Sequence, residues 1–205
     1  MGERLFLYPT WLRVWHAVNA FCFLVLLVTG ISMQYSNPDW VLVRFDIAVA
    51  SHNIAGITIV LAYFFYIIFF IFSSNKRHYR ISFKGLIKRL AIQIRYYTYG
   101  VFKREDPPFP TSWTMKFNPL QQVTYVGVMF ILFPVLILTG LALMFPEVIV
   151  DNVFGVGGTL LTSLLHASTG FLASMFLVIH LYFATMGSTF LANFKSIVNG
   201  YHEVH

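Results

Sequence analysis

The chain contains four long stretches made almost entirely of apolar residues, separated by segments that carry most of the charged and polar residues. The stretches cover about 11–35, 52–72, 123–145 and 160–186. A helix needs about 20 apolar residues to cross the ~30 Å hydrocarbon core of a bilayer. The pattern therefore predicts an all-α, integral membrane four-helix bundle, and we expect residues 1–205 to form a single membrane domain.

Composition favours a membrane protein over a soluble domain. Hydrophobic residues make up 58% of the chain and charged residues 11%, whereas soluble proteins are about 45–50% apolar and about 25% charged. The first apolar stretch is longer than the ~7–15 residues of a signal-peptide core, and no small-residue cleavage site follows it. We therefore expect it to be a retained helix.

The basic residues are distributed unevenly between the two ends of the predicted helices. If the N-terminus is cytoplasmic, 13 of the 14 Lys and Arg lie in cytoplasmic segments and only Arg44 lies outside. Because Lys and Arg concentrate in cytoplasmic loops, we expect both termini in the cytoplasm. The long basic loop between the second and third helices, about 73–118, is then cytoplasmic and contacts anionic lipid head groups. The net charge of +6 is explained in this way, and no nucleic-acid partner is expected.

Residues 82–99 of this loop mix apolar and basic residues, and two structures remain open for them. A helix in the plane of the membrane interface would sort these residues into an apolar face and a basic face. A solvated basic loop is the alternative. Asn118-Pro119 then marks the start of the third helix, because proline suits a first helical turn.

Four histidines lie inside the apolar stretches: His16, His52, His166 and His180. An ionisable side chain in a membrane helix is costly and marks a candidate functional site; a single one can also be a polar residue that is hydrogen-bonded between helices. The predicted topology places His52 and His166 near the outer face. It places His16 and His180 near the inner face. The four histidines therefore form two pairs by depth.

The last helix can contribute a side chain to both pairs. His166 and His180 are 14 residues apart, which at ~100° and ~1.5 Å per residue puts them within ~40° around the helix and ~21 Å apart along it. Zinc needs a tighter cluster of ligands, whereas a haem needs two imidazoles on opposite sides of a flat ring. The sequence thus predicts two haem b groups, one held by His52 and His166 and the other by His16 and His180.

Other residues in the apolar stretches refine this prediction. The single cysteine, Cys22, belongs to no C-x-x-C-H motif, so covalent attachment of a c-type haem is excluded. Gly56 and Gly170 each follow a pairing histidine by one helical turn, where a missing side chain would let a porphyrin approach. Close helix packing is the alternative role of such glycines.

Two further features of the sequence carry less weight. Segments 25–30 (VLLVTG) and 135–140 (VLILTG) echo each other, and the echo is suggestive only. The remaining histidines, His78, His202 and His205, lie outside the apolar stretches and are expected to be solvated.

Several motifs match one known family. They are Arg13-x-x-His16 at the start of the first stretch, His52 at the start of the second, His166 and His180 with 13 residues between them, and Phe117-Asn118-Pro119-Leu120-Gln121-Gln122 before the third. With these motifs the chain resembles the bacterial cytochrome b561 / nickel-hydrogenase b-type cytochrome family, which includes the cytochrome b subunits of thiosulfate reductase and respiratory formate dehydrogenase. Segment 117–122 is similar to the N-P-L-Q signature of the thiosulfate-reductase-like branch. The resemblance covers nearly the whole chain and implies a multi-pass protein of the bacterial inner membrane.

The resemblance also implies the same two histidine pairs and an exchange of electrons with a quinone or quinol near the cytoplasmic face. Asn118 and Gln121 would belong to the quinone site. This chain has Leu120 where the formate-dehydrogenase-like relatives have glycine, so the resemblance does not imply their backbone contact here. Capping of the third helix is the alternative role of Asn118.

Partners and charge pairs follow from the same resemblance and topology. We expect a periplasmic iron–sulfur or multihaem cytochrome c subunit, with an associated catalytic subunit, docked over the outer connections 36–51 and 146–159. Haem propionates need cations: Arg13 is placed for the inner haem and Arg44 for the outer one. Either arginine could instead anchor lipid or the partner.

The sequence leaves open the direction of electron flow and, more broadly, the class of function. Quinol oxidation that feeds a periplasmic reductase is the preferred hypothesis, and quinone reduction that drains a hydrogenase or formate dehydrogenase is its alternative. A passive membrane anchor with structural histidines is one rival. A transporter or proton channel is another, although no Asp or Glu lies inside the four apolar stretches.

Overall fold

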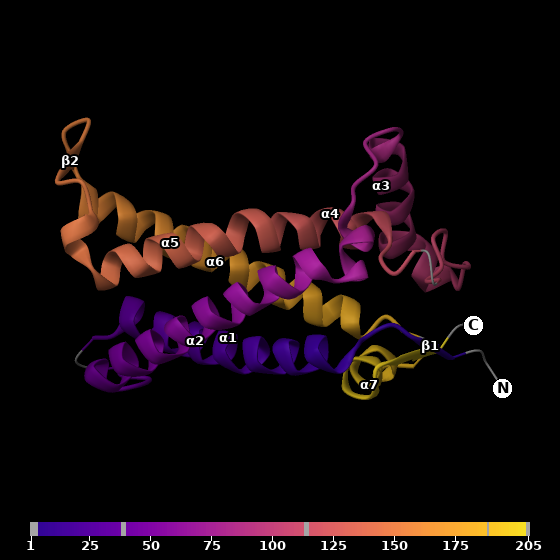
Figure 1. The fold of residues 1–205 in the computed structure, drawn as a ribbon, viewed down its shortest axis with the longest axis horizontal. Coiled ribbons are helices and arrows are strands. Elements are labelled where there is room, and N and C mark those ends of the chain that lie inside the picture. The colour runs from indigo at the N-terminus through magenta and orange to yellow at the C-terminus, as the bar shows by residue number, and fades with distance from the viewer. Residues whose placement is uncertain (1–3, 38–39, 113–114, 188, 204–205) are drawn as a thin grey trace. The chain divides into compact units, whose positions relative to one another are not determined.

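The computed structural model describes residues 4–37, 40–112, 115–187 and 189–203 (Figure 1). Pro38 and Asp39 of the first outer connection, and His205 of the tail, lie outside the described residues. Helices dominate the described chain, and the strands are limited to two short two-stranded ribbons.

Four helical segments of the described chain are long and apolar enough to cross a membrane. They are α1 (Thr10–Tyr35), α2 (Phe45–Phe72), the composite segment Pro119–Met144, and α6 (Gly158–Ala184). The prediction of an all-α protein with four membrane-spanning helices is therefore confirmed. The segment α2 begins at Phe45 rather than at 52, because Asp46 falls in its first turn, where the helix dipole favours an acidic side chain.

The third membrane-spanning segment contains a local irregularity. It consists of α4 (Pro119–Gly127), the π-helix η4 (Val128–Leu132) and α5 (Phe133–Met144). Pro134 has no backbone N–H, and its ring would clash with the carbonyl four residues earlier in a regular α-helix. The wider turn of a π-helix directly before the proline removes this conflict.

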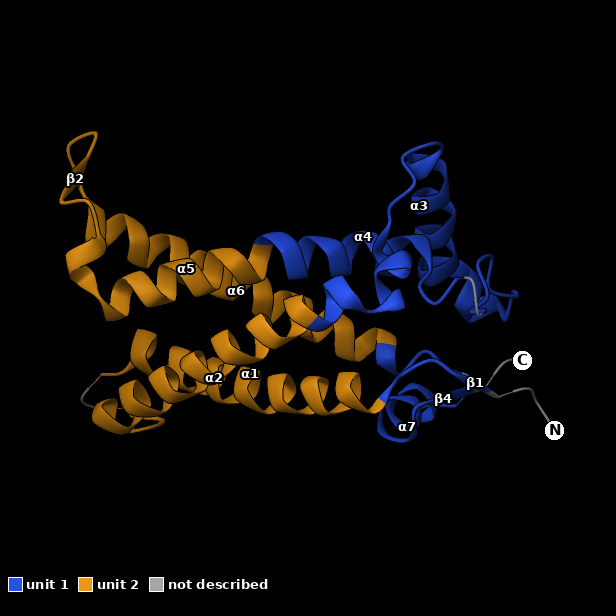
Figure 2. Cartoon of the chain, in the orientation of Figure 1, with its two compact units in different colours: residues 1–9, 69–131, 184–205 blue, residues 10–68, 132–183 orange. Residues whose placement is uncertain are grey.

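The chain forms two compact units, which Figure 2 distinguishes by colour. Unit 2 comprises residues 10–68 and 132–183 and contains α1, α5 and most of α2 and α6. The Trp15 indole nitrogen donates to the Ala62 carbonyl at 2.9 Å, and the Trp15 and Tyr66 rings pack with centroids 4.7 Å apart. These contacts hold α1 against α2. Many large apolar side chains of the four helices are exposed, as expected for surfaces that contact lipid.

Unit 1 comprises residues 1–9, 69–131 and 184–205. Its β1 (Arg4–Phe6) pairs antiparallel with β4 (Tyr201–Glu203), which follows α7 (Ala192–Asn199). The segment between α2 and α4 contains η1 (Ser74–Tyr79), α3 (Leu86–Arg95), the π-helix η2 (Tyr96–Gly100) and η3 (Val101–Lys103). Most of residues 82–99 are therefore helical rather than irregular, and the placement of this helix in the membrane interface stays a prediction.

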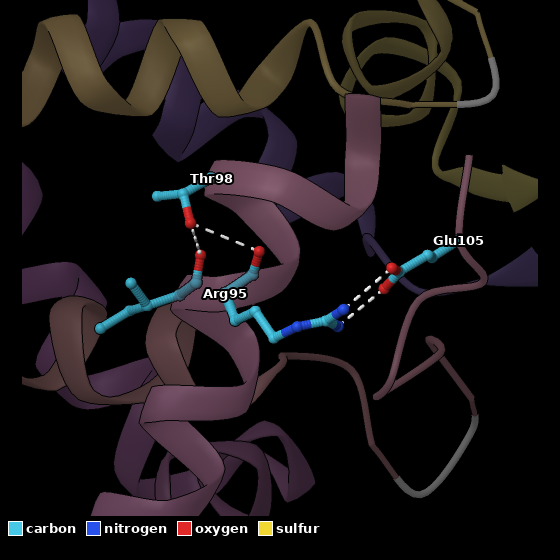
Figure 3. Close-up of polar contacts among 4 residues, drawn as sticks. Arg95, Thr98 and Glu105 are labelled. Carbon is cyan, nitrogen blue, oxygen red and sulfur yellow. Dashed lines mark hydrogen bonds and ion pairs between the residues drawn. The ribbon is translucent and has the colours of Figure 1, made fainter. Parts of the chain in front are cut away.

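A bidentate ion pair fixes the chain after α3 (Figure 3). The Arg95 guanidinium donates to both Glu105 carboxylate oxygens at 2.8 and 2.9 Å, and this hydrogen bonding raises the pKa of Arg95. The Thr98 hydroxyl donates to the Ile94 carbonyl at 2.9 Å. A Cβ on Gly100 would lie 2.9 Å from Glu105 Oε2 and 2.9 Å from Tyr96 Cδ2, so one of these side chains would have to shift. Both side chains are exposed, so this ion pair contributes little to stability.

The connection from α5 to α6 ends in a small hairpin in unit 2. After η5 (Pro146–Val148), β2 (Asn152–Val153) pairs antiparallel with β3 (Val156–Gly157). The two turn residues, Phe154 and Gly155, have φ of 53° and 85°. A left-handed backbone is unfavourable for a bulky residue, and the Phe154 side chain is fully exposed at the tip.

Candidate functional site

The four histidines all belong to unit 2 and come from three of its helices. His16 lies near the start of α1, His52 near the start of α2, and His166 and His180 near the two ends of α6. The His16 and His180 rings have centroids 6.2 Å apart, and the His52 and His166 rings have centroids 6.3 Å apart. The structure thus brings the four histidines together as two separate pairs.

The spacing within each pair fits one metal ion between two imidazoles. A ligating imidazole nitrogen lies ~2 Å from its metal, and the ring centre lies a further ~1 Å behind that nitrogen. Two imidazoles on opposite sides of one ion therefore have centres ~6 Å apart, close to the 6.2 and 6.3 Å observed. All four histidines are only half-buried, so none of them is enclosed by protein on every side.

The donor set fits haem better than a protein-ligated zinc ion. No group of three or more His, Cys, Asp and Glu side chains that could hold a metal ion occurs within the described residues. A structural zinc site needs four protein ligands and a catalytic one needs three. A haem iron already has four nitrogen ligands from the porphyrin and needs only two more, and each histidine pair contains two imidazoles.

The glycines near the histidines differ in their surroundings. A Cβ on Gly56 would meet no atom within 4 Å, and one on Gly170 would meet only Leu136 at 4.0 Å. Close helix packing at these two glycines is therefore not observed, and the space beside them is open for a flat ring. The donor set, the ring spacing and this open space together fit haem.

Two threonines that sequence reasoning overlooked contact the histidines. Thr29 Oγ1 lies 2.9 Å from His52 Nδ1, and Thr139 Oγ1 lies 2.9 Å from His166 Nδ1. Both threonines belong to the repeated segments 25–30 and 135–140. The repeat was the only signal in the sequence that could have identified them.

The two arginines proposed for haem propionates have different environments. Arg13 lies on α1 almost one turn before His16 and is half-buried. Arg44 lies outside α2 and forms an exposed ion pair with Asp46 at 2.7 Å. The carboxylate of Asp46 thus occupies the guanidinium group that was expected to meet a propionate.

Asn118 and Gln121 form the N-terminal cap of α4 in unit 1. The Asn118 side-chain oxygen accepts from the Gln121 backbone N–H at 2.9 Å, and the Gln121 side-chain oxygen accepts from the Asn118 backbone N–H at 3.2 Å. Asn118 Nδ2 also donates to the Tyr97 hydroxyl at 2.7 Å. Burial raises the pKa of Tyr97, so this hydroxyl is neutral. The capping alternative for Asn118 is therefore correct, whether or not the residue has a second role.

A buried basic cluster in unit 1 was also missed. Lys116 is 4% exposed, and its ammonium lies 3.4 Å from Asn75 Oδ1 and 4.6 Å from the Tyr8 ring centroid. Burial lowers the pKa of Lys116 to about 8 and raises that of Tyr8 to about 12. The prediction that His78 is solvated is wrong, because His78 is buried. Its pKa is lowered by burial and by the charges of Lys116 and Arg77.

Paired histidines inside a bundle of apolar helices are typical of membrane-bound b-type cytochromes. Residues 7–200 match the family model described as prokaryotic cytochrome b561, and the chain belongs to this family. It is also 38% identical over 202 residues to the provisionally named cytochrome YdhU of Escherichia coli (strain K12), an alignment that covers 98% of this chain and 76% of that protein.

Family membership fixes the general function. The protein is a multi-pass cytochrome b of the bacterial inner membrane that binds haem b and takes part in electron transport. The rival hypotheses of a passive anchor and of a transporter are therefore not retained.

Proposed function

We propose that this protein is the di-haem b membrane subunit of a respiratory oxidoreductase complex. It carries electrons between the quinone pool and a periplasmic partner subunit. The observation that supports this proposal is the presence of two histidine pairs, with ring centroids 6.2 and 6.3 Å apart, within one helical unit of a cytochrome b. One pair would suffice for a single haem.

The residues that hold the two haems come from the same three helices. His52 and His166 hold one haem, and His16 and His180 hold the other. When bound, haem iron supplies one-electron redox chemistry whose potential depends on its axial ligands and their surroundings. The shared helix α6 presents its two histidines ~21 Å apart along the axis at ~1.5 Å per residue, so the two sites lie at different depths.

The distribution of basic residues supports a direction for this arrangement. With both termini in the cytoplasm, the His16/His180 site lies toward the cytoplasm and the His52/His166 site toward the periplasm. Arg13 belongs to the cytoplasmic end of α1 and is the proposed partner of a propionate there. The exposed pair with Asp46 makes Arg44 a weaker candidate at the other end.

Quinone exchange is proposed at the cytoplasmic side, with Asn118 as a hydrogen-bond donor. A side-chain amide has two N–H donors, and the described hydrogen bonds of Asn118 use one of them toward Tyr97. The second can donate to a quinone carbonyl while the oxygen keeps capping α4. Gln121 supports the site through the same cap. Quinol oxidation is the preferred direction, and quinone reduction with electrons from a hydrogenase or formate dehydrogenase is the alternative.

The periplasmic partner is proposed to dock over the two short connections. The connection from α5 to α6 exposes apolar side chains at Val148 and Val150 and at the hairpin tip, Phe154. Exposed apolar residues in a short loop favour contact with another protein surface. An iron–sulfur or multihaem cytochrome c subunit with its catalytic subunit is the expected partner.

The test of the two-haem assignment uses four variants of the full-length protein, each with one pairing histidine changed to alanine. Haem content and the reduced-minus-oxidised spectrum are measured for each purified variant. We expect His16→Ala and His180→Ala to lose one spectral component, and His52→Ala and His166→Ala to lose the other. His202→Ala is the matched control and should keep both. If His16→Ala and His52→Ala removed the same component, the pairing would be wrong.

A further inference from the structure

The repeated segments 25–30 and 135–140 occupy equivalent positions in two helical hairpins of unit 2. The first lies on α1 and faces His52 of α2, and the second lies on α5 and faces His166 of α6. In each hairpin the earlier helix presents Thr-Gly, and the later helix presents His-x-x-x-Gly. The echo in the sequence therefore corresponds to a repeated contact in the structure.

The hydrogen bonds of Thr29 define the state of the His52 ring. Thr29 Oγ1 lies 2.6 Å from the Val25 carbonyl and 3.3 Å from that of Leu26, and its hydroxyl donates to them. The His52 ring also donates to the Leu26 carbonyl. A hydroxyl has one hydrogen, and that of Thr29 points to the Val25 carbonyl at 2.6 Å. We therefore assign Thr29 Oγ1 as the acceptor and His52 Nδ1 as the donor of their 2.9 Å contact. The Nδ1 atom of His52 therefore carries the proton, which leaves Nε2 as the nitrogen with a free lone pair.

The second hairpin repeats this geometry. Thr139 Oγ1 lies 2.6 Å from the Val135 carbonyl, 3.3 Å from that of Leu136, and 2.9 Å from His166 Nδ1. The same reasoning assigns the proton to His166 Nδ1. Both threonines are buried, so each contact is sheltered from competing water.

The adjacent glycines limit each ring from a second side. A Cβ on Gly30 would lie 3.6 Å from His52 Cε1, and one on Gly140 would lie 3.1 Å from His166 Cε1. The second distance is tighter than ordinary van der Waals contact, so the His166 ring uses the space that the missing side chain leaves. Each Thr-Gly pair thus binds one ring nitrogen and packs against the neighbouring ring carbon.

We propose that Thr29 and Thr139 are equivalent positioning residues that orient His52 and His166 and direct their Nε2 atoms to the iron of one haem. This inference rests on the proposed function of the two histidines. A hydrogen bond to the far nitrogen of a ligating histidine fixes its tautomer, orients its ring and raises its basicity. When the two hairpins are aligned by the repeat, Val126 takes the place of His16, and Tyr66 takes the place of His180. The repeat therefore does not extend to the His16/His180 pair. The proposal is therefore restricted to the His52/His166 site, and the other site serves as an internal reference.

The test uses Thr29→Val and Thr139→Val in the full-length, haem-loaded protein. Valine keeps the shape of threonine and removes the hydroxyl acceptor, so each ring loses its hydrogen bond to threonine and keeps only the one to the Leu26 or Leu136 carbonyl. We expect each variant to raise the midpoint potential of the His52/His166 component, because a less basic ligand stabilises ferric iron less. We also expect a changed low-spin EPR signal and a roughly 10–100-fold loss of haem affinity at this site only. The component of the other site should stay unchanged and shows that the variant is folded.

Three further proteins make the outcome decisive. Thr29→Ser and Thr139→Ser keep the hydroxyl and should restore the wild-type potential and EPR signal. Thr58→Val is the matched control, because Thr58 donates to the Ile54 carbonyl at 2.8 Å in the same way and is half-buried on α2. Unchanged potentials in both Val variants, or equal changes in Thr58→Val, would overturn the positioning role.

Failure of the underlying function gives a different result. If His52→Ala and His166→Ala fail to remove the component that the threonine variants alter, the assignment of the haem to these histidines is wrong. If the histidine variants remove that component while the threonine-to-valine variants leave it unaltered, only the positioning role is wrong.

Discussion

Lys116 offers a quantitative test of the structure of unit 1. Its side chain is 4% exposed, and burial lowers its pKa from the ordinary 10.5 to about 8. A protonated Lys116 therefore destabilises the folded state. We expect Lys116→Met, which keeps the length of the side chain and removes the charge, to stabilise the protein at neutral pH.

The magnitude follows from the change in proton affinity. A tenfold change in proton affinity, or one pKa unit, corresponds to ~1.4 kcal/mol. The fall in the pKa of Lys116 from 10.5 to about 8 therefore corresponds to ~3 kcal/mol of lost folding stability. The lost contact with the Tyr8 ring offsets ~1 kcal/mol of this gain. The net stabilisation at pH 7 should therefore be ~2 kcal/mol, which for a chain of this size corresponds to about 4–8 °C in the thermal midpoint.

The effect depends on pH with a definite sign. Between about pH 8 and 10.5 the unfolded state binds more protons at this lysine than the folded state, so stability rises with pH. The full penalty is present below pH 8, and ~2 kcal/mol of it is removed by pH 9.5. The advantage of Lys116→Met over the wild type should therefore disappear toward pH 9.5.

The assay is the thermal midpoint of purified, haem-loaded protein in one detergent from pH 7.0 to 9.5. Lys116→Arg is the control, because arginine stays charged throughout this range. We expect it to be less stable than the wild type, with a gap that widens as the pH rises. Parallel profiles for the wild type and Lys116→Met would refute the burial of a titrating lysine.

Three further predictions concern the proposed sites. Gly56→Leu and Gly170→Leu fill the open space beside the His52/His166 pair, so we expect each variant to fold and to lose this haem, as measured by the difference spectrum. Gly127→Leu is the control, because Gly127 also adjoins open space but lies in unit 1, and this variant should keep both haems. Asn118→Ala removes a helix cap and should cost ~1 kcal/mol; it should also slow quinone kinetics at constant haem content, and unaltered kinetics would argue against the quinone role. Phe154→Asn suits the left-handed φ of 53°; we expect unchanged spectra and less co-purified partner, and an equal yield of partner would exclude docking at this hairpin.

The membrane-spanning helices and their histidines could be predicted from local sequence. A span is defined by ~20 consecutive apolar residues, and a histidine inside such a run is conspicuous. Their boundaries were less predictable, since α2 begins at Phe45 and the third span at Pro119. Helix ends depend on caps and dipoles, as at Asp46 and Asn118, and hydropathy does not report these.

Other features could not be predicted because they depend on contacts between distant segments. The burial of His78 and Lys116 depends on packing against Phe117 and Tyr8 and is invisible in a basic, polar sequence. Likewise, the threonines of the repeat looked like ordinary helix residues. Their role depends on a histidine of the neighbouring helix. His52 lies 23 residues after Thr29, and His166 lies 27 residues after Thr139.

The sequence by itself determined the number of membrane-spanning helices and which ionisable residues lie inside them, because both follow from hydropathy along a continuous run. Helix depth also suggested which histidines could meet. Only the tertiary structure decided that the rings approach to 6.2 and 6.3 Å, that Thr29 and Thr139 contact two of them, and that Gly56 adjoins open space. These features depend on the rotation and tilt of each helix, which packing between helices sets and which no single helix encodes.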